Sequence, residues 1–248
     1  MKFKAILRQS QGIIWAIVAM LLCYFSASIE LWHSSASEEA IALRPSAFIY
    51  SLEPILFGGV IYLFPFCACL PVLMKKKVKS PTSKLTLETL LHTFTSGGVA
   101  VAIPFIFHTI LWNILAVPVN PAQYESHQLQ LYGLLNNLYD KFYGIPVYMI
   151  FFCGMFLCGG VYAIMALAFR STLPDQVVAF MLPAVIYFFW LKLSTTLSIQ
   201  YFPAPVDLFD EGITVENIPI SIIVYLLLLI IFSTIYYISD RRDRKSVV

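Results

Sequence analysis

The chain has 248 residues, of which 59% are hydrophobic and only 12% are charged. Soluble domains carry about 25% charged residues, so this composition excludes an ordinary soluble protein and indicates a polytopic membrane protein.

Six stretches are long and apolar enough to cross roughly 30 Å of hydrocarbon as helices. They cover residues 12–29, 54–74, 90–116, 145–169, 176–197 and 218–239. Backbone amides in lipid must be satisfied within their own helix, and no pattern of alternating strands is present. We therefore predict an all-α fold with six transmembrane helices in a single membrane domain, residues 1–248.

Charge distribution predicts the orientation of these helices, because Lys and Arg in short loops stay on the cytoplasmic side. Thirteen basic residues fall on one side: Lys2, Lys4, Arg8, Lys75, Lys76, Lys77, Lys79, Lys84, Arg170, Arg241, Arg242, Arg244 and Lys245. The other side carries Arg44 and Lys141. Both termini are therefore expected in the cytoplasm. Membrane insertion alone accounts for this charge asymmetry, so we predict no nucleic-acid partner. Binding of anionic membrane lipid by the basic residues is an alternative that the sequence allows.

The first twelve residues are basic and amphipathic, and we expect them to form an interfacial elbow leading into the first span. A signal peptide is the competing interpretation, because Ser26–Ser28 resembles a cleavage site. Pro54, Pro65 and Pro71 predict a kinked second span that neighbouring helices must cover. Residues 198–217 are too polar to cross lipid and too apolar for a plain loop, so they are a candidate re-entrant segment.

Small residues recur within the third and fourth spans, and they predict that these helices pack closely against their neighbours. Gly97 and Ala100 lie on one face of the third span, and Gly154, Cys158 and Gly159 lie in the fourth. All five cysteines fall in apolar spans, where we expect them to pack as small hydrophobic residues. We find no internal repeat and predict no metal site, since the Cys67 and Cys69 pair lacks the spacing of a zinc site.

No phosphate-binding loop of the GxxxxGK[ST] type occurs, so the chain has no nucleotide site of its own. An intramembrane protease is the enzyme class that must be weighed. Glu38, Glu39 and Arg44 are similar to the EExxxR signature of the CAAX-protease-like family, and His108 and Asn113 to its later motifs. The spacing fails in both, since one residue turns a helical side chain by about 100°. We therefore predict no catalytic residues and no enzyme.

Polar residues within spans are candidates for a translocation path: His108, Asn113, Lys192 and Ser194. Each has an alternative explanation. Lys192 is near the outer end of its span, where it can snorkel to water, and this explanation is favoured. His108 and Asn113 can equally hydrogen-bond between helices.

A basic segment between the second and third spans, Met74 to Glu88, is the largest cytoplasmic surface that the sequence offers to a partner. With this segment, the amphipathic start, Ser96–Leu111 (SGGVAVAIPFIFHTIL) and Phe156–Phe189, the chain resembles the ABC-2 type permeases of ABC transporters. The similarity is greatest to compact six-span forms from Gram-positive bacteria. The similarity covers nearly the whole chain, and it lies in the arrangement of spans and loops rather than in a specific sequence motif.

The resemblance implies an exporter subunit in a bacterial plasma membrane, paired with a second permease subunit. Cytosolic ATPase subunits would bind ATP and Mg, and this chain would bind no cofactor. The family's coupling element maps onto Ser80, Pro81, Thr82, Ser83, Lys84, Leu85 and Glu88. The implied cargo is an amphipathic peptide, a lipid-linked molecule or a hydrophobic drug. A bacteriocin-immunity or scaffold subunit without transport is the alternative.

Overall fold

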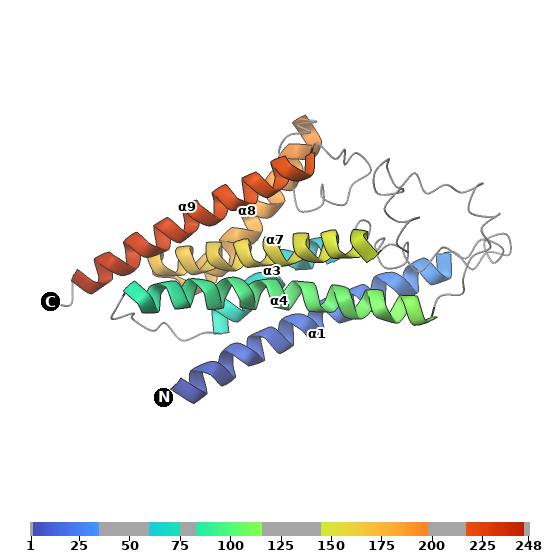
Figure 1. Cartoon of the computed structure of the whole chain (residues 1–248), viewed down its shortest axis with the longest axis horizontal. Coiled ribbons are helices and arrows are strands. Elements are labelled where there is room, and N and C mark those ends of the chain that lie inside the picture. The colour runs from blue at the N-terminus through green and yellow to red at the C-terminus, as the bar shows by residue number, and fades with distance from the viewer. Residues whose placement is uncertain (1, 35–59, 75–82, 116–144, 198–216, 246–248) are drawn as a thin grey trace.

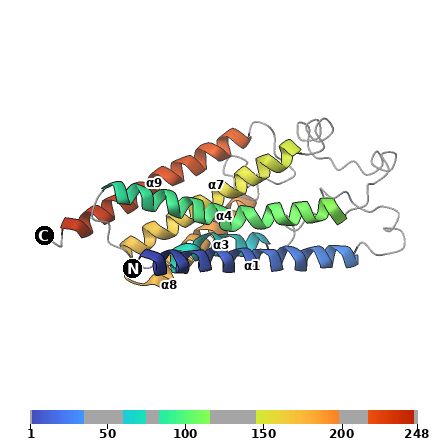
Figure 2. The ribbon, with the colours of Figure 1, turned by 60° about the horizontal axis from the view of Figure 1, so that its bottom comes forward.

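A computed structural model of the protein describes residues 2–34, 60–74, 83–115, 145–197 and 217–245. Every regular element in these ranges is an α-helix, which confirms the predicted all-α fold for them. The helices are α1 (Lys2–Ser34), α3 (Val60–Met74), α4 (Ser83–Leu115), α7 (Ile145–Thr172), α8 (Gln176–Leu197) and α9 (Asn217–Lys245). Successive helices run in alternating directions, and α1 begins at the end of the bundle where α9 finishes (Figures 1 and 2).

Four of these helices contain a stretch long and apolar enough to cross a membrane. The stretches are Thr86–Leu111, Met149–Thr172, Gln176–Leu193 and Ile222–Arg242. Shorter apolar stretches lie in α1 and α3, at Ser10–Ser26 and Tyr62–Met74. The described helices therefore indicate a multi-pass membrane protein. The start of the predicted second span, residues 54–59, lies outside the described ranges, as do residues 198–216 of the candidate re-entrant segment.

Four helices extend beyond their predicted spans, of which α7 does so least, ending at Thr172 rather than at 169. The predicted elbow is continuous with the first span, because α1 runs unbroken from Lys2 and contains no proline. Similarly, α4 begins at Ser83 rather than at residue 90, and α9 continues to Lys245 rather than ending at 239. The additional helical residues include charged ones, such as Lys84 in α4 and Lys245 in α9.

The helix pair α4 and α7 forms the centre of the bundle and makes the most extensive contact between described helices. A five-residue pattern, FxxGG, occurs in both, at Phe94–Gly98 and Phe156–Gly160. A Cβ atom added at Gly97 would lie 2.6 Å from the carbonyl oxygen of Gly159, and one added at Gly159 would lie 2.7 Å from that of Gly97. The two backbones thus touch, as small residues allow in membrane helices.

Each phenylalanine of this pattern covers a glycine of the opposite helix. The ring of Phe156 lies over Gly98, and the ring of Phe94 lies over Gly160. The two rings also meet edge to face, with centroids 5.7 Å apart. Because α4 and α7 run in opposite directions, the crossing has a local pseudo-twofold symmetry. The sequence analysis did not single out this short shared pattern.

Helix α3 is enclosed by its neighbours, since it contacts α1, α4, α7 and α8. Its two internal prolines, Pro65 and Pro71, are buried. This agrees with the expectation that neighbouring protein covers a proline-containing span. By contrast, only 11% of the apolar window of α9 and 22% of that of α8 are buried. These two helices form the periphery of the described bundle.

Candidate functional site

Polar contacts between helices gather at the end of the bundle where α4 begins and where α3, α7 and α9 finish (Figure 1). The Thr86 hydroxyl of α4 donates a hydrogen bond of 2.8 Å to the Asp240 carboxylate of α9. Both side chains are buried, Thr86 at 1% and Asp240 at 8% exposure. A buried charge is tolerated only where it is well paired. The contact therefore ties the start of one helix to the end of another.

Two further contacts satisfy carbonyl groups at helix ends, which have no partner within their own helix. The Arg170 guanidinium of α7 donates to the carbonyl of Val72, near the end of α3. The Ser239 hydroxyl of α9 donates to the carbonyl of Ser171, near the end of α7, at 2.9 Å. Side chains of adjacent helices thus cap α3 and α7. We call these three interactions, made by Thr86, Arg170, Ser239 and Asp240, the end network.

The turn that joins α7 to α8 at the same end is also fixed by local hydrogen bonds. The carboxylate of Asp175 accepts a bond of 2.7 Å from the backbone amide of Val177 and so caps the start of α8. The backbone amide of Leu173 donates to the carbonyl of Phe169 at 2.8 Å. The turn between α7 and α8, next to the network, is therefore held by hydrogen bonds on both sides.

The predicted coupling residues lie beside this network where the structure describes them. Ser80, Pro81 and Thr82 lie outside the described residues, and Ser83, Lys84 and Leu85 form the first turn of α4, with side chains not described. The Glu88 side chain is exposed, and Leu87, beside it, is 59% exposed. The described part of the predicted coupling element is therefore not a separate helix. It is the first turn and a half of α4.

The predicted translocation residues occupy separate places. His108 of α4 is fully buried and stacks on Tyr24 of α1, with ring centroids 4.7 Å apart. The ring of Phe25 meets it edge to face at 6.2 Å. Lys192 is exposed on α8, a helix that packs chiefly on α3 and α7. The structure thus does not bring His108 and Lys192 together. Asn113 lies in α4 and Ser194 in α8, with side chains not described.

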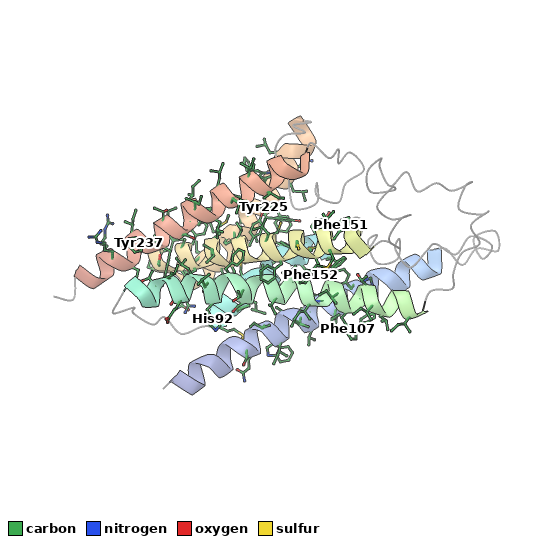
Figure 3. All side chains as sticks on the ribbon, in the orientation of Figure 1. His92, Phe107, Phe151, Phe152, Tyr225 and Tyr237 are labelled. Atoms are coloured by element: carbon green, nitrogen blue, oxygen red, sulfur yellow. The ribbon has the colours of Figure 1, made fainter. Side chains whose placement is uncertain are left out.

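A cluster of buried tyrosines in the interior was not anticipated from the sequence. Tyr162 of α7 and Tyr187 of α8 meet edge to face at 5.6 Å, and Phe64 of α3 packs on both. Tyr225, on the buried side of α9, is 2% exposed (Figure 3). The thiol of Cys69 donates to the carbonyl of Tyr162 at 3.4 Å. Aromatic rings of α3, α7 and α8 therefore meet in the interior, and the tyrosine rings among them carry polar tips that need hydrogen-bond partners when buried.

The cysteines lie where the sequence analysis expected them, in the helical core or on helix surfaces. Cys67, Cys69 and Cys158 are buried, Cys23 is half-buried and Cys153 is exposed, and all five are free thiols. Among the described residues, no group of three or more His, Cys, Asp or Glu side chains is placed to hold a metal ion. Of the residues weighed for a protease, Glu38, Glu39 and Arg44 lie outside the described ranges.

Sequence reasoning treated Arg170 only as a topological anchor, and it missed Thr86, Ser239 and Asp240. One signal could have drawn attention to Asp240. It is an acidic residue that immediately precedes the basic run RRDRK, residues 241–245, at the end of an apolar span. The first turn of α4 contains no acidic residue to interact with the positive end of its helix dipole. Nothing in the sequence pairs these two observations, because the residues are 154 positions apart.

Comparison with known protein families, with curated proteins and with solved structures finds no match.

Proposed function

We propose that this chain is the membrane-spanning permease subunit of an ABC transporter, driven by ATPase subunits that bind ATP and Mg. The observation that carries the proposal is the course of α4. Starting beside the basic segment, it continues unbroken to its crossing with α7 at Gly97. A displacement of its first turn would therefore reach the centre of the bundle through rigid helix rather than through a flexible loop.

The length of α4 supports this role. Its 33 residues span about 50 Å, whereas the hydrocarbon layer is about 30 Å thick. Roughly 20 Å of helix must therefore tilt or extend beyond the lipid. Lys84 and Glu88, near the start of α4, favour extension at that end into the cytoplasm. A helix start that follows a positively charged segment and exposes Leu87 and Glu88 is a suitable contact surface for a soluble ATPase.

The proposed topology has six crossings in a bacterial plasma membrane and both termini in the cytoplasm. Under this topology the amphipathic first turns of α1 lie at the cytoplasmic interface, and residues 198–217 re-enter the outer leaflet. A second permease subunit completes the transport path, and peripheral lipid covers the exposed faces of α8 and α9. The cargo class follows from the resemblance described above: an amphipathic peptide, a lipid-linked molecule or a hydrophobic drug, exported from the cell.

Reconstitution with an ATPase encoded next to this chain tests the proposal. The two proteins should co-purify, and proteoliposomes containing both should move a fluorescent amphipathic peptide or lipid only when ATP is supplied. Glu88→Arg should leave ATP hydrolysis in place but uncouple it from transport, because the charge at the proposed contact is reversed. Glu88→Asp, which keeps the charge, is the matched control.

Two outcomes would contradict the proposal. Transport at the full rate by this chain alone, without ATP, would exclude an ATP-driven subunit. An unchanged phenotype for Glu88→Arg, in cells that depend on this chain, would instead favour the immunity or scaffold function, since that function needs no coupling contact.

A further inference from the structure

The end of α9 contacts two other helices through two consecutive residues. Ser239 binds the last turn of α7, and Asp240 binds the first turns of α4. Elsewhere α9 packs mainly on α7 and touches α4 little. The hydrogen bond between Asp240 and Thr86 therefore links two helices that otherwise make little contact with each other.

Electrostatics favours this particular arrangement. The amide groups at the start of a helix carry a partial positive charge, which a nearby carboxylate stabilises. Helix α4 has no acidic residue in its first turn. The Asp240 carboxylate of α9 lies at the end of this first turn, with one oxygen 2.8 Å from the Thr86 hydroxyl. Hydrogen bonds to a charged group are about twice as strong as neutral ones, particularly when water is excluded.

We propose that Asp240 is a positioning residue, which holds the first turns of α4 against the end of α9 through Thr86. The two helix ends then form one unit on the side of the bundle where the ATPase would bind. A role of these joined helix ends in energy coupling rests on the proposed function. The claim that Asp240 holds α4 against α9 does not depend on that function.

Hydrogen–deuterium exchange of the full chain in lipid nanodiscs tests the holding directly. Thr86→Val removes the hydroxyl while keeping the side-chain shape. We expect amides of residues 87–92 and of the last turns of α9 to exchange about tenfold faster, because a bond to a buried charge is lost. Thr86→Ser, which keeps the hydroxyl, should restore protection. Asp240→Asn, which keeps an acceptor but loses the charge, should give an intermediate increase.

Two controls separate this contact from a general loss of helix stability. Thr95 of α4 and Thr234 of α9 bind only carbonyl groups of their own helices, at 2.9 Å and 2.8 Å. Thr95→Val and Thr234→Val should leave exchange in residues 87–92 unchanged. Protection in Thr86→Val equal to that of the unsubstituted chain would overturn the proposal, as would equal losses in the two control variants.

The reconstituted complex tests the coupling role separately. Thr86→Val should lower the amount of cargo moved per ATP hydrolysed, whereas Thr86→Ser and Thr95→Val should not. Faster exchange together with unchanged transport per ATP would overturn the coupling role of Asp240. A chain that recruits no ATPase would count against the proposed function. In that case the exchange experiment still decides whether Asp240 holds α4.

Discussion

Gly97 and Gly159 set the distance between the two central helices. At Gly97, an added Cβ atom would lie 2.3 Å from the Cβ of Ala163 and 2.6 Å from the carbonyl oxygen of Gly159. Neither neighbour can move aside by changing a rotamer, because one is backbone and the other is attached directly to it. Even the smallest side chain therefore requires the helices to separate.

We accordingly predict that Gly97→Ala destabilises the protein by about 1–3 kcal/mol, the usual cost of overpacking, less the gain in helix propensity. Thermal unfolding in detergent would show a lower midpoint. Gly12→Ala is a graded comparison, since its added Cβ would lie 3.0 Å from the nearest atom, Cα of Pro71. A Gly97→Ala midpoint equal to or above that of Gly12→Ala would contradict the packing described.

Arg170 provides a second test at the residue scale. Its guanidinium binds the Val72 carbonyl, and that carbonyl lies in the last turn of α3, where helical partners are missing. Arg170→Met keeps the length of the side chain but leaves the carbonyl unsatisfied, so we expect a loss of about 1–3 kcal/mol. Arg170→Lys should recover part of this loss. Unfolding midpoints of the two variants that equal the unsubstituted value would show that the cap contributes nothing.

Residue-level chemistry was only partly predictable from the sequence. The glycines could be assigned to close packing, because small residues in spans usually serve that purpose. Their partners could not be assigned, because the FxxGG pattern can be read in the sequence but the pairing of its two copies follows only from the packing of α4 against α7. Likewise, the contact between Thr86 and Asp240 depends on tertiary structure, and no local pattern predicts it.

At the scale of the helix, α7 and α9 differ most in their surroundings. The apolar window of α7 is 67% buried, and that of α9 is 11% buried. Lipid chains are as apolar as leucine, so exposure to lipid carries little penalty and burial is governed by packing. Two leucines illustrate the contrast: Leu167 of α7 is 8% exposed and Leu227 of α9 is 53% exposed.

We predict that Leu167→Ala lowers stability by about 2 kcal/mol, because it leaves a cavity among protein atoms. Leu227→Ala should change it by less than about 0.5 kcal/mol, as for other exposed positions. Unfolding in a graded denaturing detergent measures both. A large loss for Leu227→Ala would mean that protein, rather than lipid, covers this face of α9, and the second permease subunit would then be the first candidate.

Helix positions were more predictable than helix ends. The start and finish of α8 agree with the predicted span 176–197, because Asp175 and the tight turn before it mark the start. The early start of α4 was missed, because Ser80–Glu88 was interpreted as a coupling element separate from the third span, whereas Ser83–Leu115 is one helix. Hydropathy indicates the length of the apolar segment. The helix itself continues for as long as its backbone groups and its ends have hydrogen-bond partners.

For the whole molecule, the alternating helices place both chain ends on one side of the bundle (Figure 2). The sequence alone predicts which side, from the positions of its basic residues. We predict that a C-terminal green fluorescent protein fusion will fluoresce and that a C-terminal alkaline phosphatase fusion will be inactive, as expected for a cytoplasmic end.

Cysteines introduced one at a time provide the internal control for this topology. The background is a chain in which the exposed Cys153 is replaced by serine. Glu88→Cys should react with an impermeant maleimide only after the membrane is opened, and Lys192→Cys should react in intact cells. Labelling of Glu88→Cys from outside would reverse the proposed orientation and remove the cytoplasmic contact on which the function depends.

The position of Asp240 near the end of the chain has a consequence for the order of biosynthesis. Thr86 leaves the ribosome 154 residues before its partner. At typical rates of 5–20 residues per second, this delay is roughly 8 to 30 seconds. During that time the start of α4 lacks the Asp240 carboxylate that later binds Thr86. Truncation before residue 240 should therefore yield a chain that inserts its helices and never completes the end network.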